Sequence, residues 1–290
     1  MPRRILIIVN PDAGRVARKR RHLGRVVAAL RGRGCAVEIR EAPRAGDAER
    51  VARTAEPSFD VIVAAGGDGT VAAVVNGVAA APRPIAILPL GTANVLAAEI
   101  GLPHGAAALA RVIAEAPAVP VWPGRIDGRL FLTSAGSGFD ADVVAAVDRA
   151  LKRRAGKAAF VWAALTCLVR YRKRRLTVVA DGVEHRVAGV IATTGPIYAG
   201  RFVIAPEARL SEPALHLVLL QQRSRGEVLR HYLAMLIGRL SRAHGVAVIP
   251  ARDIAITGEG GAPVQADGDI AAHPPVALTV AERPIPFVGG

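Results

Sequence analysis

The sequence predicts two folded parts, an α/β part built on a parallel sheet and a β-rich, sandwich-like part with inserted helices. Strand-like and helix-like segments alternate through the first 100 residues, and short strand-like segments separated by turn residues dominate after Pro117. Apolar residues make up 51% of the 290 residues, which is enough for two cores. We expect a first domain at residues 1–120 and a second at residues 121–290, with the boundary falling between residues 116 and 125.

The elements of the first part follow from local patterns. Continuous apolar runs predict buried strands at residues 5–9, 35–40, 60–65 and 84–89. Apolar residues at helical spacing, such as Leu23, Val26, Val27 and Leu30, predict helices between them, at residues 15–31, 47–55, 70–80 and 93–100. Strands that are apolar along their whole length are typical of a parallel sheet covered on both faces.

The second part has a different pattern. Short apolar segments separated by turn residues predict an antiparallel sandwich with strands at residues 119–122, 130–134, 176–180, 187–193, 202–205, 215–220, 246–249, 253–258 and 276–281. Helical spacing predicts insertions at residues 140–150, 156–171 and 226–241.

The most informative motif is Gly66-Gly67-Asp68-Gly69-Thr70, which stands where a predicted strand ends and a predicted helix begins. Glycine permits a close approach of the backbone to a ligand, and amides at a helix start favour negative charge. Asp68 would repel a phosphate group unless a cation lay between them. Phosphate, Mg²⁺ and Asp68 together make a coherent site, so the motif predicts a phosphotransferase that uses a nucleotide.

Two other turn-rich loops are expected at the same edge of the sheet. Asn10-Pro11-Asp12-Ala13-Gly14 and Pro89-Leu90-Gly91-Thr92 each follow a predicted strand. Ligands bind at the carboxyl ends of the strands in open α/β sheets. One shared site is therefore favoured over three unrelated turns.

These three motifs, in this order and at this spacing, resemble the diacylglycerol kinase catalytic-domain family, which includes bacterial lipid kinases and the sphingosine and ceramide kinases. Later blocks strengthen the resemblance, and they are Gly136-Ser-Gly-Phe-Asp140, Tyr198-Ala-Gly200, Ile204-Ala-Pro206 and Val264-Gln-Ala-Asp-Gly-Asp269. NAD kinases and phosphofructokinases carry similar glycine loops. Thr92-Ala-Asn94 followed by Val-Leu-Ala fits the lipid-kinase group better than NAD kinase.

The resemblance implies ATP-dependent phosphorylation of a lipid hydroxyl, such as that of diacylglycerol or a sphingoid alcohol, at a site between the two domains. It implies that ATP is bound by Asn10, Pro11, Gly14, Gly66, Gly67, Asp68, Gly69, Thr70, Gly91, Thr92 and Asn94. Asp68 would act with Mg²⁺. Asp269 stands where many bacterial members carry a Glu proposed as the general base, and Asp267 is the neighbouring candidate.

One block departs from the family pattern. Many bacterial members carry an Asp-Asp-Gly-x-x-Asp run after the Ala-Pro block, associated with a structural Mg²⁺. Here the run reads Ser211-Glu212-Pro213-Ala214-Leu215-His216. Because two of the three acidic positions are gone and Mg²⁺ prefers oxygen ligands, we do not expect that structural metal site in this chain.

Composition constrains the partners. The net charge is +14, which favours anionic partners, while an aromatic content of 4% argues against a base-stacking nucleic-acid surface. Two distant cysteines fit a cytoplasmic chain.

The apolar stretch at residues 158–169 is too short to span a bilayer, and it runs into the basic segment 170–175. Peripheral contact with an anionic membrane is one interpretation of this pattern, and a core helix is the other.

Three functions remain to be separated. The first is an ATP-dependent lipid kinase of phospholipid metabolism, the second a kinase that phosphorylates a soluble nucleotide as NAD kinases do, and the third a non-catalytic sensor of lipid or nucleotide on the same fold. A homodimer also stays open, because no motif encodes the oligomeric state.

Overall fold

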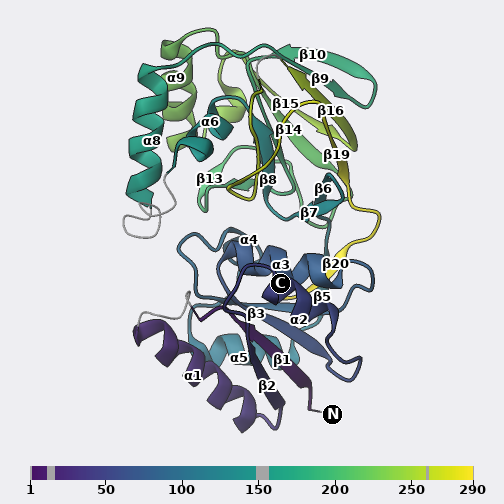
Figure 1. The fold of residues 1–290 in the computed structure, drawn as a ribbon. Coiled ribbons are helices and arrows are strands. Elements are labelled where there is room, and N and C mark those ends of the chain that lie inside the picture. Colours follow the sequence, from purple (N-terminus) through teal and green to yellow (C-terminus); the bar gives the residue numbers. More distant parts are fainter. Residues whose placement is uncertain (1, 12–16, 148–156, 259–260, 290) are drawn as a thin grey trace. The chain divides into compact units, whose positions relative to one another are not determined.

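The computed structural model of the chain describes residues 2–11, 17–147, 157–258 and 261–289. The chain forms two compact units (Figure 1). The first contains residues up to Val121 together with Arg283–Gly290, and the second is Trp122–Glu282. The sequence placed the last eight residues in the second domain, whereas the fold returns them to the first.

The first unit is built on one six-stranded sheet with the order β2-β1-β3-β4-β20-β5. Its strands are β1 (Arg4–Val9), β2 (Ala36–Glu41), β3 (Val61–Gly66), β4 (Ile85–Pro89), β5 (Ala118–Val121) and β20 (Ile285–Val288). The strands from β2 to β20 are parallel, and β5 pairs antiparallel with β20. The predicted α/β fold is thus confirmed, but the sheet is mixed at one edge.

In the part of the first unit that the structure describes, the helices beside this sheet are α1 (Ala17–Gly32), α2 (Asp47–Arg53), α3 (Asp68–Val78), α4 (Val95–Glu99) and α5 (Ala106–Glu115). The chain crosses from β1 to β2 in one direction and from β2 through β3 to β4 in the other. Right-handed crossovers therefore place α1 on one face and α2 and α3 on the other. In agreement, α1 packs on α5 and α2 packs on α3. Because both faces are covered, β3 is buried throughout.

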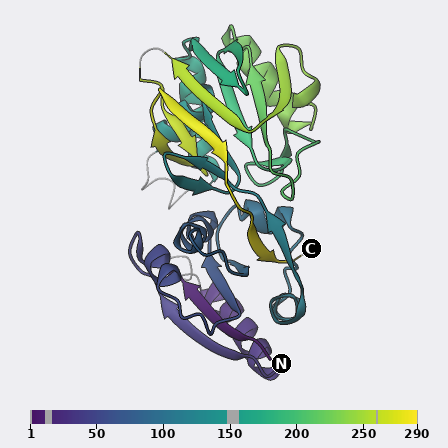
Figure 2. The same ribbon diagram turned by 90° about the vertical axis from the view of Figure 1, so that its right-hand side faces the viewer.

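The second unit is an antiparallel sandwich of two six-stranded sheets, as the sequence predicted (Figure 2). One sheet has the order β10-β9-β16-β19-β6-β7, with strands β6 (Gly124–Ile126), β7 (Arg129–Phe131), β9 (Leu176–Ala180), β10 (Val183–Val187), β16 (Asp253–Gly258) and β19 (Val276–Val280). The other has the order β15-β14-β11-β8-β17-β18, with strands β8 (Ser134–Ser137), β11 (Gly189–Thr193), β14 (Leu215–Leu220), β15 (Val246–Ala251), β17 (Val264–Ala266) and β18 (Asp269–Ala272). A two-stranded pair, β12 (Ile197–Tyr198) and β13 (Phe202–Val203), accompanies them.

Helices cover the outer face of the second sheet. They are α6 (Phe139–Ala146), α8 (Lys157–Val169), α9 (Arg225–Leu236) and the short 3₁₀ helix η1 (Leu240–Arg242). Val190 and Ala192 of β11 point into the core between the sheets, whereas Ile191 packs in a cluster with Met235 of α9. This second sheet therefore lies between the other sheet and the helices and is buried on both faces, which explains why β11 and β14 are apolar at nearly every position.

Candidate functional site

The glycine motif folds as a tight junction between β3 and α3. Gly66 ends the strand, Gly67 is the N-cap residue of the helix, and Asp68 already lies in its first turn, two residues earlier than predicted. The backbone N–H groups of Thr70 and Val71 donate to the carbonyl oxygen of Gly67. Gly67 has no side chain with which to cap the helix, and helix starts are places where proteins commonly bind anions.

The β4 loop packs directly on this junction. The backbone N–H of Leu90 donates to the carbonyl oxygen of Gly66 at 2.8 Å. A Cβ atom at Gly91 would lie 2.5 Å from Cα of Gly67 and 2.6 Å from Oδ1 of Asn94. Two glycines are therefore required where the two loops cross, which gives their presence in both motifs a steric reason.

We expect Gly91→Ala to force the two loops apart, because the added methyl group would meet backbone at Gly67. Overpacking of this kind costs about 1–3 kcal/mol of unfolding free energy, which thermal or denaturant unfolding would measure. Gly24→Ala is the matched control, since a Cβ at Gly24 within α1 meets nothing within 4 Å. Equal stability of the two variants would contradict the steric argument.

Asp68 joins the two loops through a hydrogen bond. Its Oδ1 atom accepts from the backbone N–H of Val95, at the start of α4, at 2.7 Å. Asn94 precedes this helix in a left-handed conformation with φ 48°, and its side-chain Oδ1 accepts from the backbone N–H of Gly91 at 2.9 Å. Asp68 is half-buried at the edge of the sheet where the parallel strands end, while Gly69 and Thr92 are exposed beside it.

The first loop reaches the same place. The backbone N–H of Asn10 donates to the carbonyl oxygen of Ala65 at 3.1 Å, so the end of β1 lies beside the end of β3. Asn10 and Pro11 are both half-buried there. Gly14, also predicted to bind the nucleotide, lies outside the described residues. The structure thus brings together every predicted cofactor-binding residue of the first unit that it describes.

The helix after the first loop carries concentrated positive charge. Arg18, Arg21, His22 and Arg25 line a shallow cavity of about 230 Å³ on α1. They recur at helical spacing, so they share one face of the helix. The apolar spacing of the sequence predicts this helix, but it predicts no role for the basic face.

In the second unit, Asp267 has a structural environment. Asp267 and Gly268 form the two-residue turn between β17 and β18, and both have positive φ, 49° and 84°. Such Asp-Gly turns are typical of tight hairpins. The Asp267 carboxylate accepts from the backbone N–H groups of Leu132 and Thr133, both at 2.8 Å, from that of Ser134 at 3.3 Å, and from the Thr133 hydroxyl at 2.7 Å. Burial raises the pKa of this carboxyl, and the four donors oppose that shift.

Asp269 lies in a different environment only two residues away. It is exposed at the start of β18, where it pairs with Ala266 across the hairpin. Asp267 is held by the backbone of a neighbouring segment, whereas Asp269 stands at the surface. The geometry therefore favours Asp269 of the two predicted candidates as a group that can reach a substrate.

A buried polar network leads to this turn. The Tyr198 hydroxyl donates to Oδ1 of Asp140, and Nε2 of Gln265 donates to Oδ2 of Asp140 at 3.0 Å. Oε1 of Gln265 then accepts from the backbone N–H of Gly268 at 3.0 Å. Burial raises the pKa of the Asp140 carboxyl, which the hydrogen bonds from Tyr198 and Gln265 oppose, and burial also raises that of the Tyr198 phenol.

The sequence motifs contain Asp140, Tyr198 and Gln265, but they predict no function for these three side chains. Their signal was present as three separate blocks of the family pattern. What could not be foreseen is that the three blocks share one carboxylate in the interior.

The altered run at residues 211–216 leads into β14. His216 is buried within that strand, and burial lowers the pKa of its imidazole. Within residues 2–11, 17–147, 157–258 and 261–289, no group of three or more His, Cys, Asp or Glu side chains is arranged to hold a metal ion. In the same described part of the chain, no helix is long and apolar enough to cross a bilayer.

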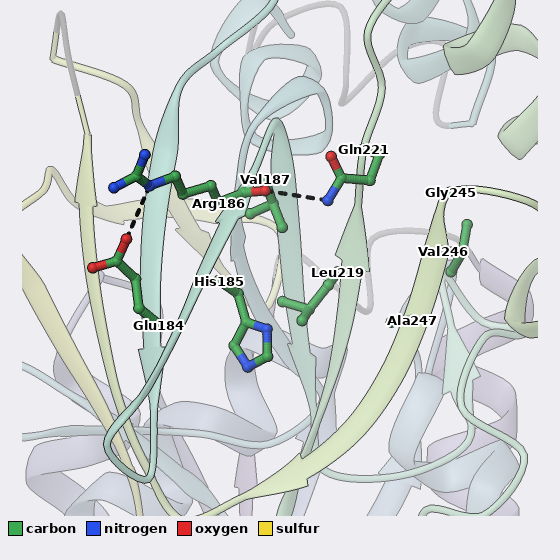
Figure 3. Close-up of a pocket in the computed structure, with 9 residues that line it drawn as sticks. All are labelled: Glu184, His185, Arg186, Val187, Leu219, Gln221, Gly245, Val246 and Ala247. Carbon is green, nitrogen blue, oxygen red and sulfur yellow. Dashed lines mark hydrogen bonds and ion pairs between the residues drawn. The ribbon is translucent and has the colours of Figure 1, made fainter.

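A cavity of about 370 Å³ lies beside β10, β14 and β15 of the second unit (Figure 3). Three of its lining residues are hydrogen-bonded to one another. Nε2 of Gln221 donates to the carbonyl oxygen of Arg186, and Nε of Arg186 donates to Glu184. None of the residues lining it belongs to a motif that the sequence singled out. We therefore do not assign it to the candidate site.

Comparison with protein families matches both parts of the chain. Residues 4–126 match the diacylglycerol kinase catalytic domain, and residues 133–287 match the YegS C-terminal NAD kinase beta sandwich-like domain.

Individual proteins are also similar. The diacylglycerol kinase of Bacillus subtilis is 30% identical over 234 residues, which cover 79% of this chain and 77% of that protein. The diacylglycerol kinase of Mycobacterium tuberculosis is 30% identical over 288 residues, covering 95% of this chain and 92% of that protein. The crystal structure of a diacylglycerol kinase from Bacillus anthracis has a similar fold, with a TM-score of 0.82 at 23% identity over 100% of this chain and 98% of that one.

Proposed function

Since the chain belongs to the family of lipid kinases that join a diacylglycerol kinase catalytic domain to a YegS-type sandwich domain, we propose that it transfers the γ-phosphoryl group of ATP to a lipid hydroxyl. Diacylglycerol is the first candidate substrate, because the similar proteins of Bacillus subtilis and Mycobacterium tuberculosis bear that name. The observation that carries the proposal is the junction at Gly67, where a helix start, two crossing loops and the Asp68 carboxylate meet.

The residues at this junction fit a nucleotide polyphosphate. The start of α3 offers backbone amides to phosphate oxygens, and the exposed Thr92 hydroxyl lies on the adjoining loop. The absence of Cβ atoms at Gly67 and Gly91 lets the loops lie close together. We assign nucleotide binding to Asn10, Pro11, Gly66–Thr70, Gly91, Thr92 and Asn94, and to Gly14 from the sequence.

Asp68 would hold Mg²⁺ together with the phosphates. Mg²⁺ keeps several waters and is commonly bound through one or two carboxylates plus substrate phosphates, which matches the Asp68 carboxylate beside the start of α3. When bound, the metal ion would neutralise charge on the transferred group. The hydrogen bond from Val95 fixes one oxygen of Asp68, and thereby the direction of the carboxylate.

We assign Asp269 as the general base that accepts the proton of the lipid hydroxyl. The support is that it stands exposed directly after the Asp267-Gly268 turn, while the Asp267 carboxylate accepts four hydrogen bonds from residues 132–134. Gln265 would act as a positioning residue, because it holds the backbone of the turn that precedes Asp269.

Gln265→Leu tests that role. It removes the hydrogen bonds to Asp140 and Gly268, and a displaced base costs about 10²-fold in rate. We expect kcat to fall roughly tenfold to 10²-fold while the KM values for ATP and lipid change little. Gln221→Leu, which removes a hydrogen bond from a glutamine elsewhere in the same unit, is the control and should leave kcat unchanged. A fall of Tm in the Gln265→Leu variant without any fall of its kcat would assign Gln265 a structural role alone.

A lipid substrate resides in a membrane, so we infer peripheral contact with an anionic bilayer from the cytoplasmic side. The net charge of +14 supports attraction to such a surface. A homodimer is compatible with this proposal. Measuring the oligomeric state of the chain in solution would show whether it forms.

The proposal is tested by incubating the full chain with labelled ATP, Mg²⁺ and a panel containing diacylglycerol, a sphingoid base and NAD. We expect a labelled phospholipid from diacylglycerol. Label in NAD would instead favour the soluble-nucleotide reaction. Nucleotide binding without any labelled product would favour the sensor.

A further inference from the structure

Exposed apolar side chains are concentrated on two helices of the second unit. Of the twelve large apolar side chains that are exposed in the described part of the chain, eight lie on α8, on α9 or on the residue that follows α9. They are Val161, Trp162, Leu165, Val169, Leu229, Leu233, Leu236 and Ile237. Trp162 and Ile237 are each 68% exposed, so these are not the margins of buried residues. A concentration of this kind marks an interaction site.

The eight side chains share one direction on each helix. On each helix, the spacing of these residues places them on one stripe of the helix surface. The opposite stripes pack inward, because Ala163 of α8 and Val228 of α9 belong to one buried cluster with Phe139 and Val143 of α6. The two helices therefore have a common inner side and leave their apolar stripes outward. We call the eight outward residues the α8–α9 face.

The two helices that carry the stripes are adjacent. The helices pack against each other, and they lie side by side on one flank of the second unit (Figure 1). The end of α8 lies beside the start of α9, since the Tyr171 hydroxyl donates to the carbonyl oxygen of Gln222. The residues that follow α8 and those that precede α9 are thus brought to the same end of the face.

That shared end is strongly basic. Exposed cations gather there from both segments, and they are Arg170, Arg172, Lys173, Arg175, Arg223 and Arg225. Two carboxylates that the structure describes near this end are already engaged, because Asp142 pairs with Arg174 at 2.7 Å and Glu227 accepts from the backbone N–H of Arg223 at 2.6 Å. α8 itself contains no acidic residue. The face is therefore apolar along its length and positive at one end.

We propose that the α8–α9 face is the surface by which this protein docks on an anionic phospholipid bilayer. Apolar side chains flanked by arginine and lysine are the composition of helices that lie in the membrane interface. Anionic lipid headgroups supply the negative charge that the six cations require. A second copy of the same face would bring the same cations, and among the described residues of this face no carboxylate stands ready to match them. The inference rests on the proposed function in one respect, which is that the lipid substrate is presented by the bilayer.

The test uses the full chain and three variants. The apolar variant combines Trp162→Gln, Leu233→Gln and Ile237→Gln, and the charge variant combines Arg172→Gln, Lys173→Gln and Arg175→Gln. The control combines Ile39→Gln and Val183→Gln, which alters exposed apolar residues away from the face. All the altered side chains are exposed, so thermal unfolding should show the same Tm as the wild type.

Cosedimentation is measured with vesicles of phosphatidylcholine alone and with vesicles of equal parts phosphatidylcholine and phosphatidylglycerol. We expect the wild type and the control to bind the anionic vesicles, and the apolar variant to bind them roughly tenfold less tightly. The charge variant should lose the preference for anionic vesicles, and added salt should weaken wild-type binding. Equal binding by the apolar variant and the wild type would overturn the proposal. So would a dimer that the apolar substitutions dissociate without any change in vesicle binding.

Turnover separates this proposal from the proposed function. With diacylglycerol in vesicles, the apolar variant should be slower than the control, and with a short-chain, water-soluble diacylglycerol it should match the control. If the wild type phosphorylates no lipid but still binds vesicles through the face, the proposed function fails and the docking surface stands. If the wild type phosphorylates lipid and the face has no effect on vesicle binding, the docking proposal fails alone.

Discussion

Asp68→Asn is expected to reduce lipid phosphorylation by at least about 10²–10³-fold, the usual effect of removing one electrostatic group from a transition state. Asn retains an oxygen that can accept from the backbone N–H of Val95, so the crossing of the two loops should persist. What disappears is the negative charge that would hold Mg²⁺ against the phosphates. Initial rates with saturating ATP and diacylglycerol, together with the Tm, measure both consequences. Asp68→Ala, which also removes the oxygen that accepts from Val95, should abolish turnover.

Asp47→Asn provides the matched control. Asp47 is also an aspartate in the first turn of a helix of the first unit, but it pairs with Arg50 on its own helix and belongs to none of the motifs. Its substitution should leave turnover unchanged. Wild-type turnover by a folded Asp68→Asn protein would reject the assignment of Asp68 to the metal and phosphate site.

The architecture of the first unit could be predicted because its signals are local. A buried parallel strand is a continuous apolar run, and Ile5 to Val9 or Val61 to Ala65 needs no distant partner to be recognised. The loops that follow such strands must share one edge of the sheet. The contacts of Asn10 with Ala65 and of Leu90 with Gly66 are the direct result.

Elements defined by distant partners were missed. β20 contains Pro286 and spans only four residues, so no periodic pattern marks it, yet it inserts between β4 and β5. The predicted strand at residues 119–122 consequently belongs to the first unit as β5, although the sequence placed it with the sandwich. Periodicity reports burial, but it does not report which strand is the neighbour.

The candidate base shows the same limit at the level of single residues. Asp267 and Asp269 are two positions apart and carry the same chemistry. The sequence could predict a hairpin at Asp267-Gly268, but it could not show that the Asp267 carboxylate folds back on the backbone of Leu132 and Thr133. That contact spans more than 130 residues and assigns the two carboxylates different environments.

Asp269→Asn is expected to lower kcat by about 10²–10⁴-fold, the usual contribution of general-base catalysis. Asp269 is exposed at the start of β18, so the Tm should remain close to that of the wild type. Asp269→Glu keeps the carboxylate and lengthens it by one methylene, and it should retain most of the turnover that Asn loses. Steady-state kinetics at saturating substrate, with the pH profile of kcat, provides the measurement. An unchanged kcat for Asp269→Asn would exclude it as the base.

Asp267→Asn is the neighbour that makes this result interpretable. Its carboxylate accepts from three backbone N–H groups and one hydroxyl, and an amide that turns its NH₂ group toward those donors leaves some of them unpaired. Each unpaired buried donor costs about 1–3 kcal/mol. In a domain of this size a loss of 1 kcal/mol lowers Tm by about 2–4 °C. Loss of stability at Asp267 and loss of kcat at Asp269 would therefore separate the structural carboxylate from the catalytic one. A stable Asp267→Asn protein with strongly reduced kcat would reverse the two roles.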